Sequence, residues 1–162
     1  MTKGLAVTFA VGLLIIGAVV WGVLYSKQGA HLVPQGSILK IRTQKVADLN
    51  SLVVIDFRLT NNADYPMTIR RADMTVETKD GKTPEGSAVA AEDVKKLFAY
   101  YPLLGERFND PLRIRDKVPP HQTVDRMMAF QIELPFADLE ARKKITMRIE
   151  DATGPVVEFS AR

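Results

Sequence analysis

The chain has 162 residues, of which 46% are hydrophobic and 25% are charged, and its formal net charge is +3. This length suffices for one domain with its own core, and the nearly balanced charge argues against a nucleic-acid-binding or anionic-lipid-binding surface. There is no cysteine, which excludes disulfides, thiolate metal sites, iron–sulfur clusters and covalently attached haem.

Residues 4–25 form an uncharged run, GLAVTFAVGLLIIGAVVWGVLY, that predicts a transmembrane anchor. As a helix its 22 residues would be about 33 Å long, against a hydrocarbon core of about 30 Å. Aromatic residues at its C-terminal edge suit the headgroup layer. A cleaved signal peptide is the alternative, but the run exceeds the usual h-region and no convincing cleavage site follows. The residues that mark the expected anchor are Gly4, Leu14, Trp21 and Tyr25.

The charges on the two sides of this anchor favour opposite membrane topologies. Lys3 and the α-amino group favour a cytoplasmic N-terminus, whereas Lys27, Lys40, Arg42 and Lys45 favour the opposite topology. Most of the second group belongs to the first predicted strand. We therefore expect a bacterial inner-membrane protein with an extracytoplasmic, periplasmic domain, and the cytoplasmic side stays open.

Small residues recur along the predicted anchor. Ala6, Ala10 and Gly17 share one face of a helix, as in membrane helices that pack closely against each other. A helix–helix contact through this face is one interpretation, and a chance pattern is the other.

Residues 26–36 are expected to form a linker, because glycine and proline interrupt regular structure there. The period-2 alternation of β-strands follows over residues 37–162. About seven short strands with turns between them predict an all-β, Ig-like β-sandwich. The expected strands are 37–44, 51–61, 67–78, 112–116, 123–134, 145–150 and 156–160.

The alternation also predicts which side chains point inward. In the second strand we expect Asp56 and Arg58 on a solvated face, opposite an inward row of Val53, Ile55, Phe57 and Leu59. In the first strand, Leu39 and Ile41 are expected inward. The phase of the alternation changes near Arg70-Arg71, which predicts a β-bulge. Asp80-Gly81 predicts a hairpin turn.

Residues 85–111 depart from the strand pattern and predict a helical insertion. Val94, Leu97, Phe98 and Tyr101 recur at helical spacing, with acidic residues in the first turn. The aromatic and aliphatic side chains that follow either seal the helix onto the core or remain exposed as an interaction patch. The expected patch is Tyr100, Tyr101, Leu104 and Phe108.

The sequence offers no recognisable enzymatic site. His31 and His121 stand apart from any serine, cysteine or metal motif. Glu92-Asp93 is explained as helix N-terminal charge, and Glu150-Asp151 points to opposite faces of a strand. Arg142–Lys144 is expected to be a solvated turn, with a membrane or partner contact as the alternative. We therefore expect no catalytic residue, metal ligand, cofactor, small-molecule substrate or nucleic acid.

Residues 52–83 carry a family resemblance. A strand ends in Asn and a Pro-containing turn, and later Val-Pro-Pro-His-Gln-Thr precedes Phe-Gln-Ile-Glu-Leu-Pro. This arrangement resembles small bacterial Ig-like domains of the late-embryogenesis/water-stress type, in which a Pro-Gly-x-Thr-like turn precedes the later strand. His121 replaces the glycine, and the insertion at 85–111 also departs from the pattern. The resemblance implies a binding or structural role and transfers no functional residue.

Two functions follow from these expectations. The first is a non-enzymatic accessory subunit whose partners are the lipid bilayer and proteins of a larger membrane complex, of respiratory, photosynthetic, transport or secretion type. The second is a free-standing cell-envelope protein that binds a ligand or protects against stress. An enzyme with an unrecognised site is a third and weaker reading.

Overall fold

The computed structural model describes residues 11–22 and 34–162. The chain divides into two compact units, residues 1–32 and 33–162, and each is described by itself. In the first unit, residues 11–22 are helical and their apolar side chains are exposed, including 74% of Leu14. None of the described helices has both the length and the hydropathy needed to cross a lipid bilayer. The rest of the predicted anchor lies outside the described residues, and so do His31 and most of the predicted linker.

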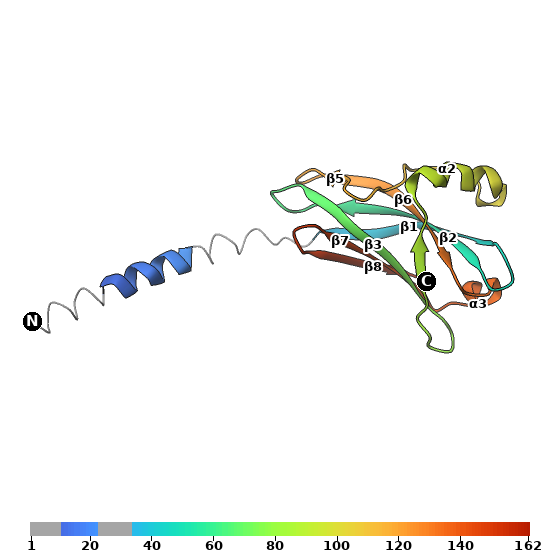
Figure 1. Cartoon of the computed structure of the whole chain (residues 1–162), viewed down its shortest axis with the longest axis horizontal. Helices are drawn as coiled ribbons and strands as arrows, with labels where there is room; N and C mark the ends of the chain where they lie inside the picture. Colours follow the sequence, from blue (N-terminus) through green and yellow to red (C-terminus); the bar gives the residue numbers. More distant parts are fainter. Residues whose placement is uncertain (1–10, 23–33) are drawn as a thin grey trace, which may run out of the picture. The chain divides into compact units, whose positions relative to one another are not determined.

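The second unit is an all-β domain whose eight described strands form one sheet, folded over into two layers (Figure 1). Two α-helices and a short 3-10 helix complete it. The strands are β1 (Gln35–Lys45), β2 (Ser51–Thr60), β3 (Met67–Glu77), β4 (Glu85–Ala88), β5 (Lys117–Val118), β6 (Thr123–Ile132), β7 (Lys144–Asp151) and β8 (Val156–Ala161). The helices are α2 (Ala91–Tyr100), η1 (Pro102–Leu104) and α3 (Phe136–Glu140).

The strand order is β1-β2-β6-β4-β3-β7-β8, and all of these neighbours are antiparallel. β1, β2 and β6 make one layer, and β3, β7 and β8 make the other. β4 joins them because it pairs with both β6 and β3. Its Gly86 lies so close to Met74 and Phe130 that a Cβ there would overlap the terminal methyl of Met74, so a larger residue at this corner would require the Met74 side chain to move.

The two edge strands of the sheet, β1 and β8, face each other instead of facing solvent. A Cβ on Gly36 of β1 would overlap the ring of Phe159 of β8. Further along β1, the Thr43 hydroxyl donates a hydrogen bond of 2.6 Å to Glu140 in α3. Covered edges of this kind protect a sheet from pairing with a strand of another chain.

The main core fills the space between the two layers. The predicted inward row of β2 is confirmed, since Val53, Ile55, Phe57 and Leu59 are all 0% exposed, and Met74 of β3 is buried in the same core. β6, β7 and β8 complete this core with residues that include Met128, Phe130, Ile145, Met147 and Val157. The predicted β-bulge is confirmed as a register shift between Ile69 and Arg71.

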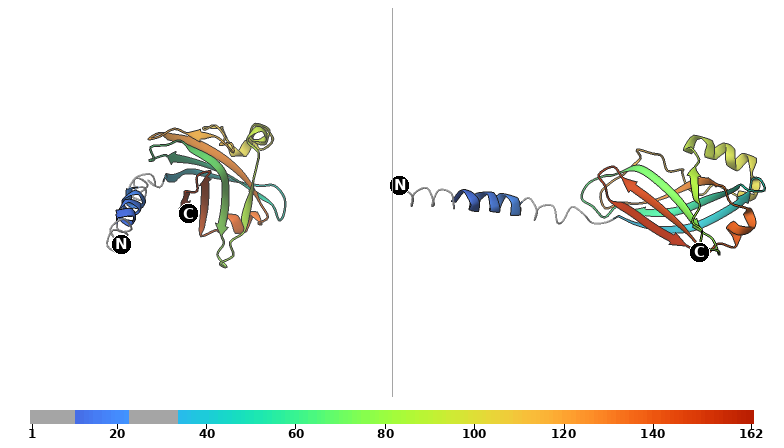
Figure 2. Two further views of the ribbon diagram at one scale, coloured as in Figure 1. Left: turned by 60° about the vertical axis from the view of Figure 1, so that its left-hand side comes forward. Right: turned by 60° about the horizontal axis from the view of Figure 1, so that its bottom comes forward.

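A second, smaller core lies on the outer face of β2 and β6, where α2 covers the sheet (Figure 2). Leu52 and Val54 of β2 pack there against Val94 of α2 and Leu104 of η1. Leu97, Phe98 and Tyr101 pack against the same cluster, so the predicted apolar face of the helix is confirmed. β2 is consequently buried on both faces.

The local structure corrects three predictions. Residues 85–88 form β4, so the helical insertion is shorter than expected and occupies residues 91–110. Leu112 is buried but hydrogen-bonds to Met127 outside any named strand, and the strand of this region is β5. A bulge between Ile38 and Lys40 turns Ile38 toward the core and leaves Leu39 47% exposed.

Asn61 joins the turn after β2 to the turn before β6. It is fully buried, and its Nδ2 donates to the carbonyl oxygens of Tyr65 at 2.8 Å and Val118 at 3.0 Å. Its Oδ1 accepts the Ala63 backbone N–H at 3.0 Å, so both ends of the amide are satisfied. This side chain therefore connects the turn at 61–66 to the turn at 118–122.

Candidate interaction surface

A buried ion pair lies on the outer face of the first layer. Arg42 of β1 and Asp56 of β2 are 8% and 2% exposed, and Arg42 Nη2 lies 2.5 Å from Asp56 Oδ2. The prediction that Asp56 faces solvent is therefore wrong, whereas Arg58 is exposed as expected. The outer face of β2 is covered here by the helical insertion, which supplies the remaining partners of the pair.

Three groups of the helical insertion bind this ion pair. Arg42 Nη1 donates to the carbonyl oxygens of Leu104 at 3.1 Å and Glu106 at 2.7 Å. Asn109 Nδ2 donates to Asp56 Oδ1 at 2.9 Å. The pair is thus hydrogen-bonded to two backbone carbonyl oxygens and to one side chain of the insertion.

Aromatic rings of the insertion lie against the same guanidinium. The Arg42 Cζ atom is 5.0 Å from the ring centroid of Phe98 and 5.5 Å from that of Phe108. The ammonium of Lys40 lies 4.9 Å from the Phe108 ring. These distances are within the range of cation–π attraction, which gains strength where the cation is desolvated.

The residues predicted as an interaction patch divide into two groups. Leu104 is 2% exposed and belongs to the second core, so its place in the patch was wrong, and Tyr101 is half-buried against Tyr100. Tyr100 and Phe108 are 77% and 61% exposed, and Leu103, between them in sequence, is 88% exposed. We call Tyr100, Leu103 and Phe108 the exposed tip.

Charges around the exposed tip are balanced. The insertion, residues 91–110, carries three basic side chains, Lys95, Lys96 and Arg107, and four acidic ones, Glu92, Asp93, Glu106 and Asp110. Lys40 adds a cation beside Phe108. A surface of this kind attracts neither a polyanion nor a polycation over long range.

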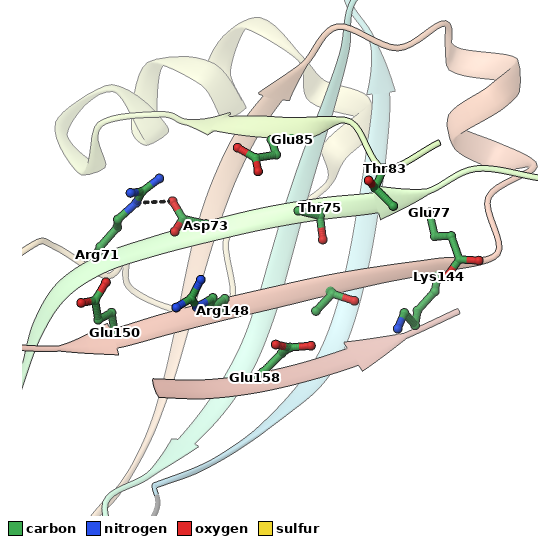
Figure 3. Close-up of a pocket in the computed structure, with 11 residues that line it drawn as sticks. Arg71, Asp73, Thr75, Glu77, Thr83, Glu85, Lys144, Arg148, Glu150 and Glu158 are labelled. Atoms are coloured by element: carbon green, nitrogen blue, oxygen red, sulfur yellow. Dashed lines mark hydrogen bonds and ion pairs between the residues drawn. The ribbon is translucent and has the colours of Figure 1, made fainter. Parts of the chain in front are cut away.

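A second surface, on the outer face of β3, β4, β7 and β8, consists of charged side chains and a few threonines (Figure 3). It forms a groove of about 480 Å³. Asp73 lies opposite Arg148, and Arg148 lies opposite Glu158, in the strand register. Arg71 lies opposite Glu150 and also binds Asp73 at 2.7 Å. Opposite charges on neighbouring strands stabilise a solvated sheet face.

The groups that often carry catalysis lie apart. His121 is exposed and its Nε2 lies 2.9 Å from Asp64 in a neighbouring turn. Asp151 is buried, and its carboxylate accepts hydrogen bonds from the Thr68 N–H and the Thr153 hydroxyl. Glu150 points instead into the charged groove. In the described part of the chain, no three acidic or histidine side chains are placed to hold a metal ion.

Two acidic side chains have shifted ionisation for local reasons. The Thr78 hydroxyl, followed by Lys82, lowers the pKa of Asp80 to about 2 in the β3–β4 turn. A bidentate bond from Arg58, with both distances 2.8 Å, lowers the pKa of Asp125 on the exposed face of β6. Both groups are on the surface and pair with neighbours, which is typical of structural contacts.

Neither a family model nor a curated protein sequence matches the chain. Among solved structures, an uncharacterised β-sandwich protein from Clostridium difficile is 9% identical, with a TM-score of 0.43, over 81% of this chain and 87% of that chain. The archaellum periplasmic stator protein FlaG from Sulfolobus acidocaldarius is 10% identical, with a TM-score of 0.33, over 80% and 100%. A β-glucuronidase from glycoside hydrolase family 2 is 7% identical, with a TM-score of 0.46, over 78% and 12%. These likenesses concern the fold alone.

Proposed function

We propose that this protein is a non-enzymatic, single-pass membrane protein whose β-sandwich docks through the exposed tip onto a protein of a larger membrane assembly. The observation that carries the proposal is the contrast within one short segment. Leu103 is 88% exposed while its neighbour Leu104 is 2% exposed and fixed in the second core. An apolar side chain held outward by a buried neighbour is presented to a partner at little entropic cost.

The surroundings of the exposed tip favour a protein as the occupant. Balanced charge gives no preference for anionic lipid or nucleic acid, which select a basic surface. Tyrosine is enriched at the energetic centres of protein interfaces. Partner binding by strand addition is disfavoured because the edges of β1 and β8 are covered. The tip is therefore the surface on which we place the partner.

The membrane anchor in this proposal rests on the sequence of residues 4–25. Its uncharged length, the aromatic residues at its end and the helix over 11–22 support it. Lys3 supports an extracytoplasmic position for the domain. A tether to the bilayer would raise the effective concentration of the domain beside a membrane partner, so a small docking surface would suffice.

The strand pairings support an Ig-like sandwich as the scaffold. β1, β2 and β6 are neighbours in the manner of strands A, B and E, and β3, β7 and β8 in the manner of C, F and G. The family resemblance of residues 52–83 points the same way. The two sheets of such a sandwich are usually separate. Here β4 joins them, because it pairs with β6 of one layer and β3 of the other.

The experiment is extraction of the full chain from its native membranes in mild detergent, followed by native gel electrophoresis and mass spectrometry. The proposal predicts co-migration with a larger assembly. It also predicts that the variant Tyr100→Ser with Leu103→Ser releases the protein as a free species. The matched control, Ile114→Ser, replaces an aliphatic residue that is 54% exposed on another loop and should remain in the assembly. Migration of the parent protein as a free monomer would contradict the proposal.

A further inference from the structure

We propose that the buried Arg42–Asp56 ion pair is a positioning device for the exposed tip, and that the fold of the sheet does not depend on it. The inference rests on the proposed function, because it names what holds the docking surface in place. It assigns a specific role to two residues of the sheet, Arg42 and Asp56, that do not touch the partner themselves.

The first support is the cost of burying the pair. Both side chains are more than nine-tenths buried, and Arg42 Nε has no hydrogen-bond partner in the described part of the chain. Desolvating two charges offsets most of their attraction, so apolar residues of similar volume often stabilise a fold equally well. Stability alone therefore gives a weak reason for an ion pair at this place.

The second support is that the hydrogen bonds of the pair to the insertion are directional. The fork of Arg42 fixes two carbonyl oxygens, those of Leu104 and Glu106, and the second oxygen of Asp56 fixes Asn109. Hydrogen bonds of this kind specify distance and angle, whereas apolar contacts tolerate sliding. The side chains of Arg42 and Asp56 thus define where residues 104–109 lie on the sheet.

The third support is that this segment has few other polar contacts. Within the described chain, the backbone of residues 106–109 makes no hydrogen bond to another backbone group. The bonds to Arg42 and Asp56 are the polar contacts that connect it to the sheet, since the ion pair of Arg107 with Asp110 is local. Phe108, which belongs to the exposed tip, packs against the same guanidinium. Without the pair, residues 106–109, and with them Phe108 of the exposed tip, would lose their polar contacts to the sheet.

The test uses the full chain, whose lack of cysteine permits a single spin label. The label is placed by Leu103→Cys in the exposed tip or by Ile114→Cys on the control loop, each in the parent and in the variant Arg42→Met with Asp56→Leu. In reconstituted membranes we expect the variant to unfold within a few degrees of the parent. The electron paramagnetic resonance spectrum should show a several-fold faster label motion at position 103 and no change at position 114.

Equal motion at position 103 in parent and variant would overturn the inference. If the variant does not fold, seen as fast motion at position 114 as well, Arg42→Lys decides. That variant keeps the charge but cannot reach Asp56 and both carbonyl oxygens together, so the inference predicts faster motion at position 103 alone. If the spectrum of the label at position 103 is the same in Arg42→Lys as in the parent, the inference is overturned too.

A second readout separates this inference from the proposed function. A photo-reactive benzoylphenylalanine at position 103 is activated in native membranes of the parent and the variant. The two proposals together predict a protein adduct in the parent and at least a fivefold lower yield in the variant. No adduct in the parent would refute docking through the tip, while the spin-label spectra would still decide the positioning role.

Discussion

Replacing Asn61 by alanine is expected to cost the domain about 3 kcal/mol of unfolding free energy. The substitution leaves the buried Ala63 N–H without its partner and removes the bonds that the Asn61 amide donates to the carbonyl oxygens of Tyr65 and Val118. The unsatisfied N–H costs about 1–3 kcal/mol and each of the two lost bonds about 0.5–1.5 kcal/mol, which makes about 2–6 kcal/mol together. A domain of this size typically has about 5–15 kcal/mol in total. The loss is therefore a large fraction of its stability.

The assay is thermal and urea unfolding of the full chain in detergent, followed by circular dichroism. The expected loss lowers the midpoint by roughly 10 °C. Asn62→Ala is the matched control, because Asn62 is half-buried and its side chain makes no hydrogen bond to a described residue. Its expected effect is within about 0.5 kcal/mol. Equal and small effects of the two substitutions would refute the reasoning that Asn61 joins the two turns.

Three further substitutions probe the closure of the sheet, the second core and the β3–β4 turn. Gly36→Ala should cost about 1–3 kcal/mol in thermal unfolding because the new Cβ meets Phe159; unchanged stability would mean that β1 and β8 do not meet. Val94→Ala should cost about 1–3 kcal/mol in the same assay, since Val94 is 1% exposed; a loss below about 0.3 kcal/mol would place α2 off the sheet. The Asp80 carboxyl should titrate by NMR with a pKa of about 2, and Thr78→Val should raise it. Because the folded pKa is below the unfolded value of about 3.9, the turn contact stabilises the fold above pH 4 and is lost as the pH falls through 2.

The strands with regular alternation could be predicted from the sequence, and β4 could not. β7 alternates over its eight residues and β2 alternates from Ile55 to Thr60, and the phase change near Arg70 located the bulge. β4 is the four-residue segment EGSA, which has no β-branched residue and no apolar row. Its position depends on Gly86 fitting between two strands from other parts of the chain, and this tertiary effect leaves no local pattern.

Burial of Asp56 was missed although the sequence carried a signal for it. The run Leu52-Val53-Val54-Ile55 is apolar at both parities, which is typical of a strand covered on both faces. That signal indicates that something packs on the outer face of β2. The partner of Asp56 could not be found in the same way, because Arg42 and Asn109 are brought to it by β1 and by the distant helical insertion.

The exposed tip was located only approximately, for a related reason. Up to Tyr101, helical spacing identifies the residues that face the sheet. The segment then continues as a 3-10 turn with a different period. In η1 the neighbours Leu103 and Leu104 point to solvent and core respectively. A periodicity of 3.6 residues, applied beyond Pro102, could not assign the two leucines.

The measurement that tests the central claim most directly is photo-cross-linking in native membranes with benzoylphenylalanine at position 103 and, in parallel, at position 114. The account predicts one dominant adduct with a different membrane-associated protein at position 103 and none at position 114. Adducts with lipid or with a second copy of this chain at position 103, or the same proteins at both positions, would contradict docking of this domain on a specific partner.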